Sequence, residues 1–504
     1  MASKANPEKE QAQLEQFKAG LKLDGDNPLD KFFHYLVESE DHALALIYYV
    51  DHPHEPAPAV PAEGSIEAGF LLYWIHYPPK EVDKWLEQHA LLDGVFKELQ
   101  KLAPPTRITP MQYDVLVEKI DTKAVPWNDG TLIGTKSFEQ LDPGWMLAAI
   151  NYAINIVIGG IVSPFPVPPN QGTIATATLT PKPEHVHPGQ QPPDPVIGII
   201  GDWGTGFYTD SNGGDCAAKR VLADITAQPI DYLMHLGDVY YAGTDWRPLP
   251  GEEYLNFKML WPDQGSGRNF TLNSNHEMYG DGSGYFDVAL ESGGPFGHQQ
   301  GLSYFALEYH DWLLLGLDSG YFSDQENGLK FYMDGAIGTA IHQEQVEQIK
   351  AVCARHGRNK PIMVMTHHNP CDTFTAETNI LFKQVSEAIG AVGPAVWYWG
   401  HVHNGIVYNQ LSIGNSIPWV PTKGRCCGHA AIPFGDGWGL EDNSNIDYYA
   451  HTHDGQFPPD DPHVRNGYAL VTLHKDGGFS EAFYEVSNGV PVYKKTWSAS
   501  DLGF

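Results

Sequence analysis

From residue 195 onward the sequence contains a series of short apolar runs, each of which ends in polar residues. Five of these runs are VIGIIGD, DYLMHLGD, RNFTLNSNHE, PIMVMTHH and AVWYWGHVH, and segments compatible with helices, such as residues 216–227 and 342–356, lie between them. Buried strands that alternate with helices are typical of α/β folds, in which functional residues collect at the carboxyl ends of the strands. The second half of the chain is therefore predicted to form a layered α/β domain.

Two further strand pairs make this pattern mixed. Residues 304–310 and 312–317 read as a hairpin across Asp311, and residues 468–474 and 479–486 read as a second hairpin. Hairpins join antiparallel strands. The predicted fold class is therefore α/β with an antiparallel part (α+β), not a purely parallel sheet.

Residues 1–163 carry a different pattern. Apolar residues recur there with helical spacing, most clearly over 80–102, which predicts a helical N-terminal domain. The most apolar stretch, residues 145–162, contains Asn151 and Asn155. Asparagines are costly in lipid, so a buried helix is favoured there over a membrane-associated one.

Prolines cluster between the two halves, around a Thr-rich segment at residues 173–180. This composition is typical of a linker or of an extended segment that crosses a surface. We therefore expect a helical domain at 1–163, a Pro-rich linker at 164–194 and the α/β domain at 195–504.

The balance of charge narrows the classes of partner. The chain has 31 Lys and Arg against 62 Asp and Glu, a formal net charge of −31. A nucleic acid or an anionic membrane would need a cationic face, so we expect neither as a partner. The five cysteines form no CxxC pattern and the first residues lack the apolar core of a signal peptide, so a cytoplasmic location is expected.

The polar ends of the five runs form one ordered set of candidate metal ligands. In chain order they are GDWG at 201–204, GDVYY at 237–241, NHE at 275–277, VMTH at 364–367 and GHVH at 400–403. A single Gly-Asp pair is most often a turn, but together the blocks offer carboxylates, a phenol, an amide oxygen and imidazoles. Such donors suit Fe, Mn or Zn, and two adjacent cations need a bridging anion, for which Asp238 is the candidate.

These five blocks resemble those of the calcineurin-like metallophosphoesterases and, within them, of the purple acid phosphatases. The pattern GDxG, GDxxY, GNH(D/E), VxxH, GHxH is met at every block with one departure, Ser274 in place of glycine, over roughly residues 195–435. The resemblance implies a metallophosphoesterase β-sandwich flanked by helices. It also implies two metal ions, Fe together with Zn, Mn or Fe, and a small phosphate-ester substrate.

The resemblance further implies a ligand set for each metal ion. One ion would be bound by Asp202, Asp238, Tyr241 and His403, and the other by Asp238, Asn275, His367 and His401. Many members of the family have a histidine where this chain has Gly204. The phenolate of Tyr241 is therefore expected to complete the first site, and the alternative is that Tyr241 packs as an aromatic in a turn.

The resemblance also implies the reaction, in which a metal-bound hydroxide attacks phosphorus. His276 is then the catalytic residue that contacts the phosphate and assists the leaving group. His368 could reach the substrate or cap a loop, and Arg425 or His429 could contact phosphate or belong to a structural loop. The alternatives to a phosphatase are a non-catalytic binding scaffold of the same fold and a phosphodiesterase or nuclease, and the charge of −31 disfavours the nuclease.

Overall fold

The structure is a computed structural model, and it describes residues 173–504 with interruptions. The interruptions are residues 205–208, 211–216, 241–242, 244–252, 259, 266, 281, 322, 324–334, 338–343, 358–359, 391–392, 412–420, 432–439, 441–442, 451–463 and 487. It also describes the backbone of four two-residue strands, β1 (Asp121–Thr122), β2 (Val125–Pro126), β3 (Ile133–Gly134) and β6 (Thr209–Asp210). Apart from β1, β2 and β3, the predicted helical N-terminal domain lies outside the described residues.

The chain divides into two compact units. One contains Met1–Lys123, Lys136–Phe165 and Tyr208–Gly214, and the other contains Ala124–Thr135, Pro166–Phe207 and Asp215–Phe504. In the first unit β1 pairs with β6, and all elements described below belong to the second unit. Among the described residues, no helix combines the length and the apolar character that crossing a membrane requires.

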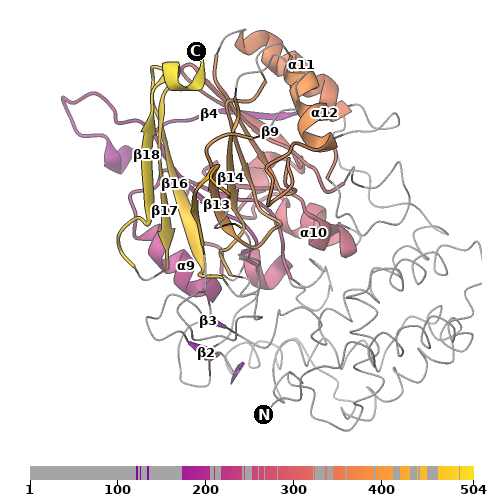
Figure 1. The fold of residues 1–504 in the computed structure, drawn as a ribbon. Coiled ribbons are helices and arrows are strands. Elements are labelled where there is room, and N and C mark those ends of the chain that lie inside the picture. Colours follow the sequence, from indigo (N-terminus) through magenta and orange to yellow (C-terminus); the bar gives the residue numbers. More distant parts are fainter. Residues whose placement is uncertain are drawn as a thin grey trace, which may run out of the picture. The chain divides into compact units, whose positions relative to one another are not determined.

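Two sheets form the second unit (Figure 1). The larger sheet has eight strands in the order β15-β13-β14-β12-β11-β10-β9-β4, and the smaller has six in the order β18-β17-β16-β5-β7-β8. The larger sheet consists of β4 (Ala175–Thr178), β9 (Phe305–Tyr309), β10 (Trp312–Gly316), β11 (Ile362–Thr366), β12 (Val396–Trp399), β13 (Gly405–Tyr408), β14 (Lys423–Cys427) and β15 (Ile446–Tyr449). The smaller sheet consists of β5 (Val196–Ile200), β7 (Tyr232–His235), β8 (Asn269–Thr271), β16 (Gly467–Leu473), β17 (Phe479–Glu485) and β18 (Tyr493–Trp497).

Among the described residues of this unit, helices are fewer than strands. The α-helices are α9 (Ala217–Thr226), α10 (Asn275–Tyr279), α11 (Glu344–His356) and α12 (Ile380–Ile389). The remaining helical turns are η1 (Pro183–His185), η2 (Tyr254–Lys258), η3 (Gly284–Ala289), η4 (Gly297–Gln299) and η5 (Ala499–Leu502).

The five apolar runs form β5, β7, β8, β11 and β12, as the sequence predicts. In the smaller sheet β5, β7 and β8 are parallel neighbours, and in the larger sheet β10, β11, β12 and β14 are parallel neighbours. Both predicted hairpins are present, as the antiparallel pairs β9/β10 and β16/β17. The mixed α/β fold class is therefore confirmed.

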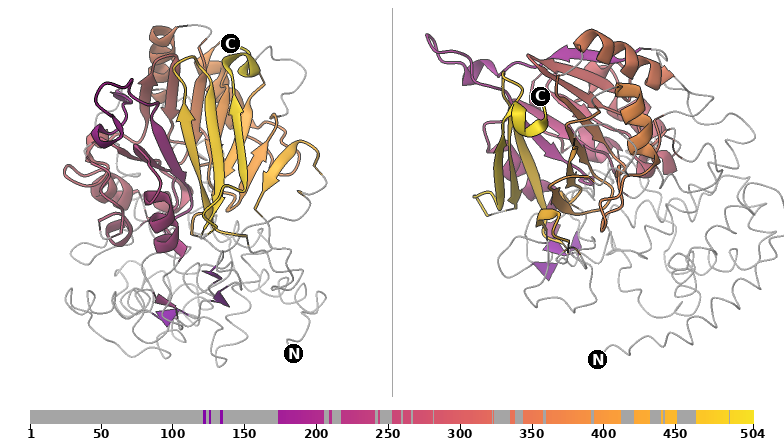
Figure 2. Two further views of the ribbon diagram at one scale, coloured as in Figure 1. Left: turned by 90° about the vertical axis from the view of Figure 1, so that its left-hand side faces the viewer. Right: turned by 45° about the horizontal axis from the view of Figure 1, so that its top comes forward.

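Successive side chains along the strands of the larger sheet point alternately into two separate hydrophobic cores. In β10, Trp312 and Leu314 belong to the core shared with the smaller sheet, which includes Phe483 of β17. Leu313 and Leu315, which alternate with them along the strand, face the other core, which α11 and α12 cover (Figure 2). Side chains of successive strand residues point to opposite faces, so one apolar run fills both cores. The predicted sandwich with flanking helices is therefore confirmed.

Within the segment 164–194, residues Ala175–Thr178 form β4 at the edge of the larger sheet. Ala175 pairs with Phe305 and Thr178 with Glu308, so β4 runs parallel to β9. The strand is mostly exposed, and threonine favours the extended backbone of a strand. The Thr-rich part of this segment thus extends the sandwich.

Candidate metal site

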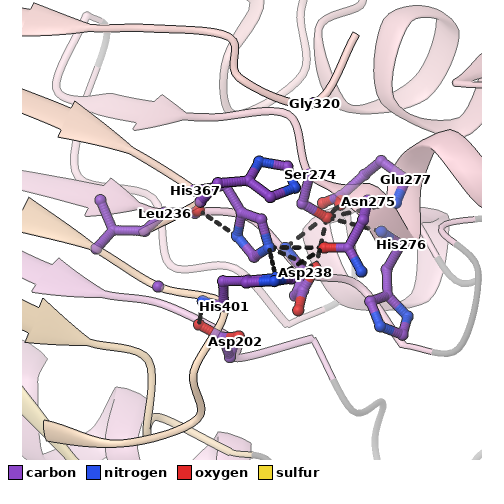
Figure 3. Close-up of polar contacts among 12 residues, drawn as sticks. Asp202, Leu236, Asp238, Ser274, Asn275, His276, Glu277, Gly320, His367 and His401 are labelled. Carbon is purple, nitrogen blue, oxygen red and sulfur yellow. Dashed lines mark hydrogen bonds and ion pairs between the residues drawn. The ribbon is translucent and has the colours of Figure 1, made fainter. Parts of the chain in front are cut away.

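Polar residues that follow strands of both sheets meet at one place (Figure 3). Three come from the smaller sheet, namely Asp202 after β5, Asp238 after β7 and Asn275 after β8. Three come from the larger sheet, namely His367 after β11, and His401 and His403 after β12. The structure thus brings together six of the seven predicted metal ligands, and the seventh, Tyr241, lies outside the described residues.

Four of these six residues have a left-handed backbone. The φ angle is +56° at Asp202, +74° at Asp238, +67° at His401 and +49° at His403. A non-glycine residue in this region carries a strain of about 1–3 kcal/mol, and such residues cluster at functional sites. The turns are also crowded, because a Cβ atom on Gly400 would lie 2.4 Å from Oδ2 of Asp202. The glycine of the GHVH block is therefore required by this close approach.

The first group of donor atoms contains two carboxylates and an imidazole. Nε2 of His403 lies 3.4 Å from Oδ1 of Asp202 and 3.8 Å from Oδ2 of Asp238. The other oxygen of Asp202, Oδ2, accepts the backbone N–H of His401 at 2.9 Å. Oδ1 of Asp202 and Oδ2 of Asp238 are buried and have no hydrogen-bond partner among the described residues. Buried oxygens without a partner are unfavourable, and a cation between these two would satisfy both.

The second group lies on the other side of Asp238. Nδ1 of His367 lies 2.9 Å from the carbonyl oxygen of Leu236. A carbonyl oxygen can only accept a hydrogen bond, so Nδ1 carries the proton and Nε2 keeps its free electron pair. This Nε2 lies 2.8 Å from Oδ1 of Asn275 and 3.2 Å from Oδ1 of Asp238. Nδ1 of His401 lies 3.2 Å from both Nε2 of His367 and Oδ1 of Asn275. Asp238 thus turns one oxygen to each group, which is the geometry of a bridging ligand.

The pKa shifts of these groups follow from the burial of two carboxylates and several imidazoles close together. Burial and then the charge of Asp238 raise the pKa of Asp202 well above its ordinary value. Burial opposes ionisation of Asp238, but attraction to the protonated forms of His367 and His276 outweighs it and holds the pKa of Asp238 well below its ordinary value. Burial lowers the pKa of His367 to about 3. A neutral imidazole is the form that binds metals.

His276, the predicted catalytic residue, lies buried in α10 next to Asn275. Its ring is stacked on the ring of Tyr240, with 3.9 Å between the centroids and 15° between the planes. The hydroxyl of Tyr240 lies 2.6 Å from Nε2 of His403. Tyr240 therefore contacts both the first donor group and His276. The sequence did not point to Tyr240, because the spacing of the motif selects its neighbour Tyr241. The signal that could have found Tyr240 was the presence of two adjacent tyrosines.

His368 lies buried beside the second donor group. Together with His367 and His401 it forms a cluster of imidazoles that could hold a metal ion. Nδ1 of His368 lies 2.9 Å from Oγ of Ser319, and the backbone N–H of His368 donates to the same Oγ at 3.2 Å. Ser319 was also missed from the sequence. Its position after β10, the parallel neighbour of β11, was the signal that could have found it.

The structure places Arg425 and His429 in the interior of the protein. The guanidinium of Arg425 pairs with Glu481 through two bonds, Nε to Oε2 and Nη2 to Oε1, each 2.6 Å long. Arg425 is fully buried and also donates to the backbone carbonyl of Tyr408. His429 is fully buried as well, with its ring against Gly405, and burial lowers its pKa to about 3. For both residues this geometry fits the structural alternative.

The fold and the site together define a two-sheet α/β protein with a candidate two-metal site at converging strand ends. No family model matches the sequence, and no curated protein matches it. Among solved structures, the chain is similar to the purple acid phosphatase PPD1 from yellow lupin (Lupinus luteus) seeds, with 15% identity and a TM-score of 0.41 over 63% of this chain and 56% of that one. It is also similar to PhoD, with 10% identity and a TM-score of 0.37 over 62% of this chain and 70% of that one.

A further similar structure is the sulfate thiohydrolase SoxB from Thermus thermophilus, with 10% identity and a TM-score of 0.31. The match covers 63% of this chain and 60% of that one. The chain therefore spans a little over half the length of the lupin enzyme. Identities and TM-scores at this level do not define a family, so the function is inferred from the residues of the site.

Proposed function

We propose that this protein is a two-metal hydrolase of phosphate esters of the calcineurin-like metallophosphoesterase family. The observation that carries the proposal is the orientation of Asp238, with Oδ1 toward His367 and Oδ2 toward His403. The five ordered blocks of the sequence support the same function. The substrate is a small phosphate ester, and the ions are Fe together with Zn, Mn or Fe.

The proposed ligand sets follow the two donor groups. The first ion is held by Asp202, Asp238, His403 and the phenolate of Tyr241, and the second by Asp238, Asn275, His367 and His401. When bound, the two cations activate water and offset the negative charge of the phosphoryl oxygens.

The chain's own residues supply orientation and a proton. His276 lies next to the ligand Asn275, and the stacked ring of Tyr240 restricts its rotation. In the proposed reaction it donates a proton to the oxygen of the departing alcohol. Nδ1 of His368 contacts Oγ of Ser319. In the proposed reaction His368 contacts a phosphoryl oxygen.

Elemental analysis combined with a panel of phosphate esters tests the function. The purified full-length protein should carry close to two metal ions per chain and should hydrolyse an activated aryl phosphate. A matched diester in the panel separates a phosphatase from a phosphodiesterase. Two bound metals without turnover of any ester would instead indicate the binding scaffold, and a chain that binds no metal would contradict the site.

Changing Tyr241 to Phe tests the phenolate ligand. Phenolate is a hard anionic donor that suits Fe(III), and charge transfer from it to the ion colours a protein violet. The protein reconstituted with iron and oxidised should therefore show a visible absorption band that Tyr241→Phe removes. Tyr240→Phe is the matched control. If this second variant loses the band and Tyr241→Phe keeps it, the ligand is Tyr240, whose hydroxyl lies 2.6 Å from His403.

A further inference from the structure

Ser274 is the one residue of the five blocks that departs from the pattern of the family, and it lies between Asp238 and α10 (Figure 3). Its side chain is fully buried. The hydroxyl donates to Oδ1 of Asp238 at 2.5 Å and also contacts Oε2 of Glu277. The same oxygen accepts the backbone N–H of His276 at 3.0 Å. One hydroxyl thus connects the candidate bridging carboxylate to the helix that carries Asn275 and His276.

The position of Ser274 is fixed by two glycines from other elements. A Cβ atom on Gly237, which precedes Asp238, would lie 2.9 Å from Cβ of Ser274. A Cβ atom on Gly320, in the loop after β10, would lie 2.9 Å from the carbonyl oxygen of Ser274. Both backbones therefore approach Ser274 more closely than any side chain would allow. This packing restricts the backbone and the Cβ atom of Ser274, from which the hydroxyl projects.

The hydrogen bond falls on a particular oxygen of Asp238. Oδ1 is the oxygen that faces Nε2 of His367, at 3.2 Å, whereas Oδ2 faces His403. A donor on Oδ1 opposes rotation of the carboxylate and so keeps Oδ2 directed at the first donor group. Groups that hydrogen-bond to a ligating carboxylate orient it and tune the affinity for the metal.

We propose that Ser274 is a positioning residue of the metal centre, which orients the carboxylate of Asp238 between the two ions. The inference rests on the proposed function, because it requires two ions that share Asp238. A glycine at this position offers no such donor. This chain should therefore bind its ions more tightly with serine than with glycine at position 274.

Metal titration of two variants tests the inference. Zn²⁺ is titrated calorimetrically into the metal-free full-length protein and into Ser274→Ala and Ser274→Gly. Both variants should lose roughly 10- to 100-fold in affinity, the usual effect of removing a partner of a metal ligand. Ser274 is also the N-cap of α10, a position where glycine is tolerated far better than alanine. The melting temperature should therefore fall further for Ser274→Ala than for Ser274→Gly, while the two affinities fall alike.

Ser498→Ala provides the matched cap control. Ser498 forms a capping box at η5 near the C-terminus, so its loss should lower the melting temperature and leave Zn²⁺ affinity unchanged. If Ser274→Gly binds two Zn²⁺ as tightly as the unaltered protein, Ser274 is only a cap and the inference is wrong, although the proposed function stands. If the unaltered protein binds no pair of ions, neither two Zn²⁺ nor Zn²⁺ together with Fe, the proposed function fails and the inference fails with it.

Discussion

Replacing Asp238 with Asn should remove most of the bound metal and essentially all of the hydrolytic activity. The side chain keeps its size, but both donor groups lose the charged oxygen that Asp238 turns toward them. The loss of metal affinity should exceed the ~10- to 100-fold effect of removing a partner of a ligand, because Asp238 is proposed to touch both ions. Elemental analysis and turnover of an aryl phosphate measure the two effects.

Asp311→Asn is the matched control for this substitution. Asp311 lies in the turn between β9 and β10, at the opposite end of β10 from the site, and pairs only with the partly exposed Lys360 among the described residues. The same chemical change there should alter neither metal content nor turnover. Two metals and near-normal turnover in Asp238→Asn would contradict the site assignment.

Replacing His276 with Ala should leave both metals in place and slow the hydrolysis of esters that have poor leaving groups by roughly 10²- to 10⁴-fold. A general acid matters most when the departing alkoxide is strongly basic, so activated aryl esters should be affected much less. The measurement is kcat/KM for the variant and the unaltered protein over a series of esters graded by leaving-group pKa. His187→Ala, which changes an exposed histidine, is the matched control. Equal losses for all esters would point instead to a role in phosphate binding.

The strands and most of the site could be predicted because their signals are local. Each apolar run forms a strand, and the polar residue that ends the run is carried to the edge of a sheet by that strand. Asp202 after β5 and His367 after β11 were found in this way, although 165 positions separate them in the chain. Parallel strands place their carboxyl ends at the same edge of a sheet, which groups the first three blocks in the smaller sheet and the last two in the larger. That the two groups meet at one site was implied by the resemblance of the whole set to a known family.

The residues that were missed, and those whose role the sequence left open, depend on contacts that no motif marks. Arg425 was a candidate for phosphate binding, but its partner Glu481 lies in the other sheet, 56 positions away. Ser319 has no motif, and its role follows only from the contact with His368. Adjacent tyrosines in a turn present a further ambiguity, because spacing alone does not tell which ring of Tyr240 and Tyr241 turns inward.

The site draws on both sheets, and this has a thermodynamic consequence. Asp202 and Asp238 extend from the smaller sheet and His367 and His403 from the larger, so ions held by all four act as a reversible cross-link of the sandwich. A ligand that binds the folded state but not the unfolded state raises the free energy of unfolding, by about 2.7 kcal/mol when its concentration is 100 times Kd. By linkage, the packed sandwich binds the ions more tightly by the same free energy with which the bound ions stabilise it. Substitutions that loosen the packing between the two sheets should therefore weaken metal affinity even when they lie far from the site.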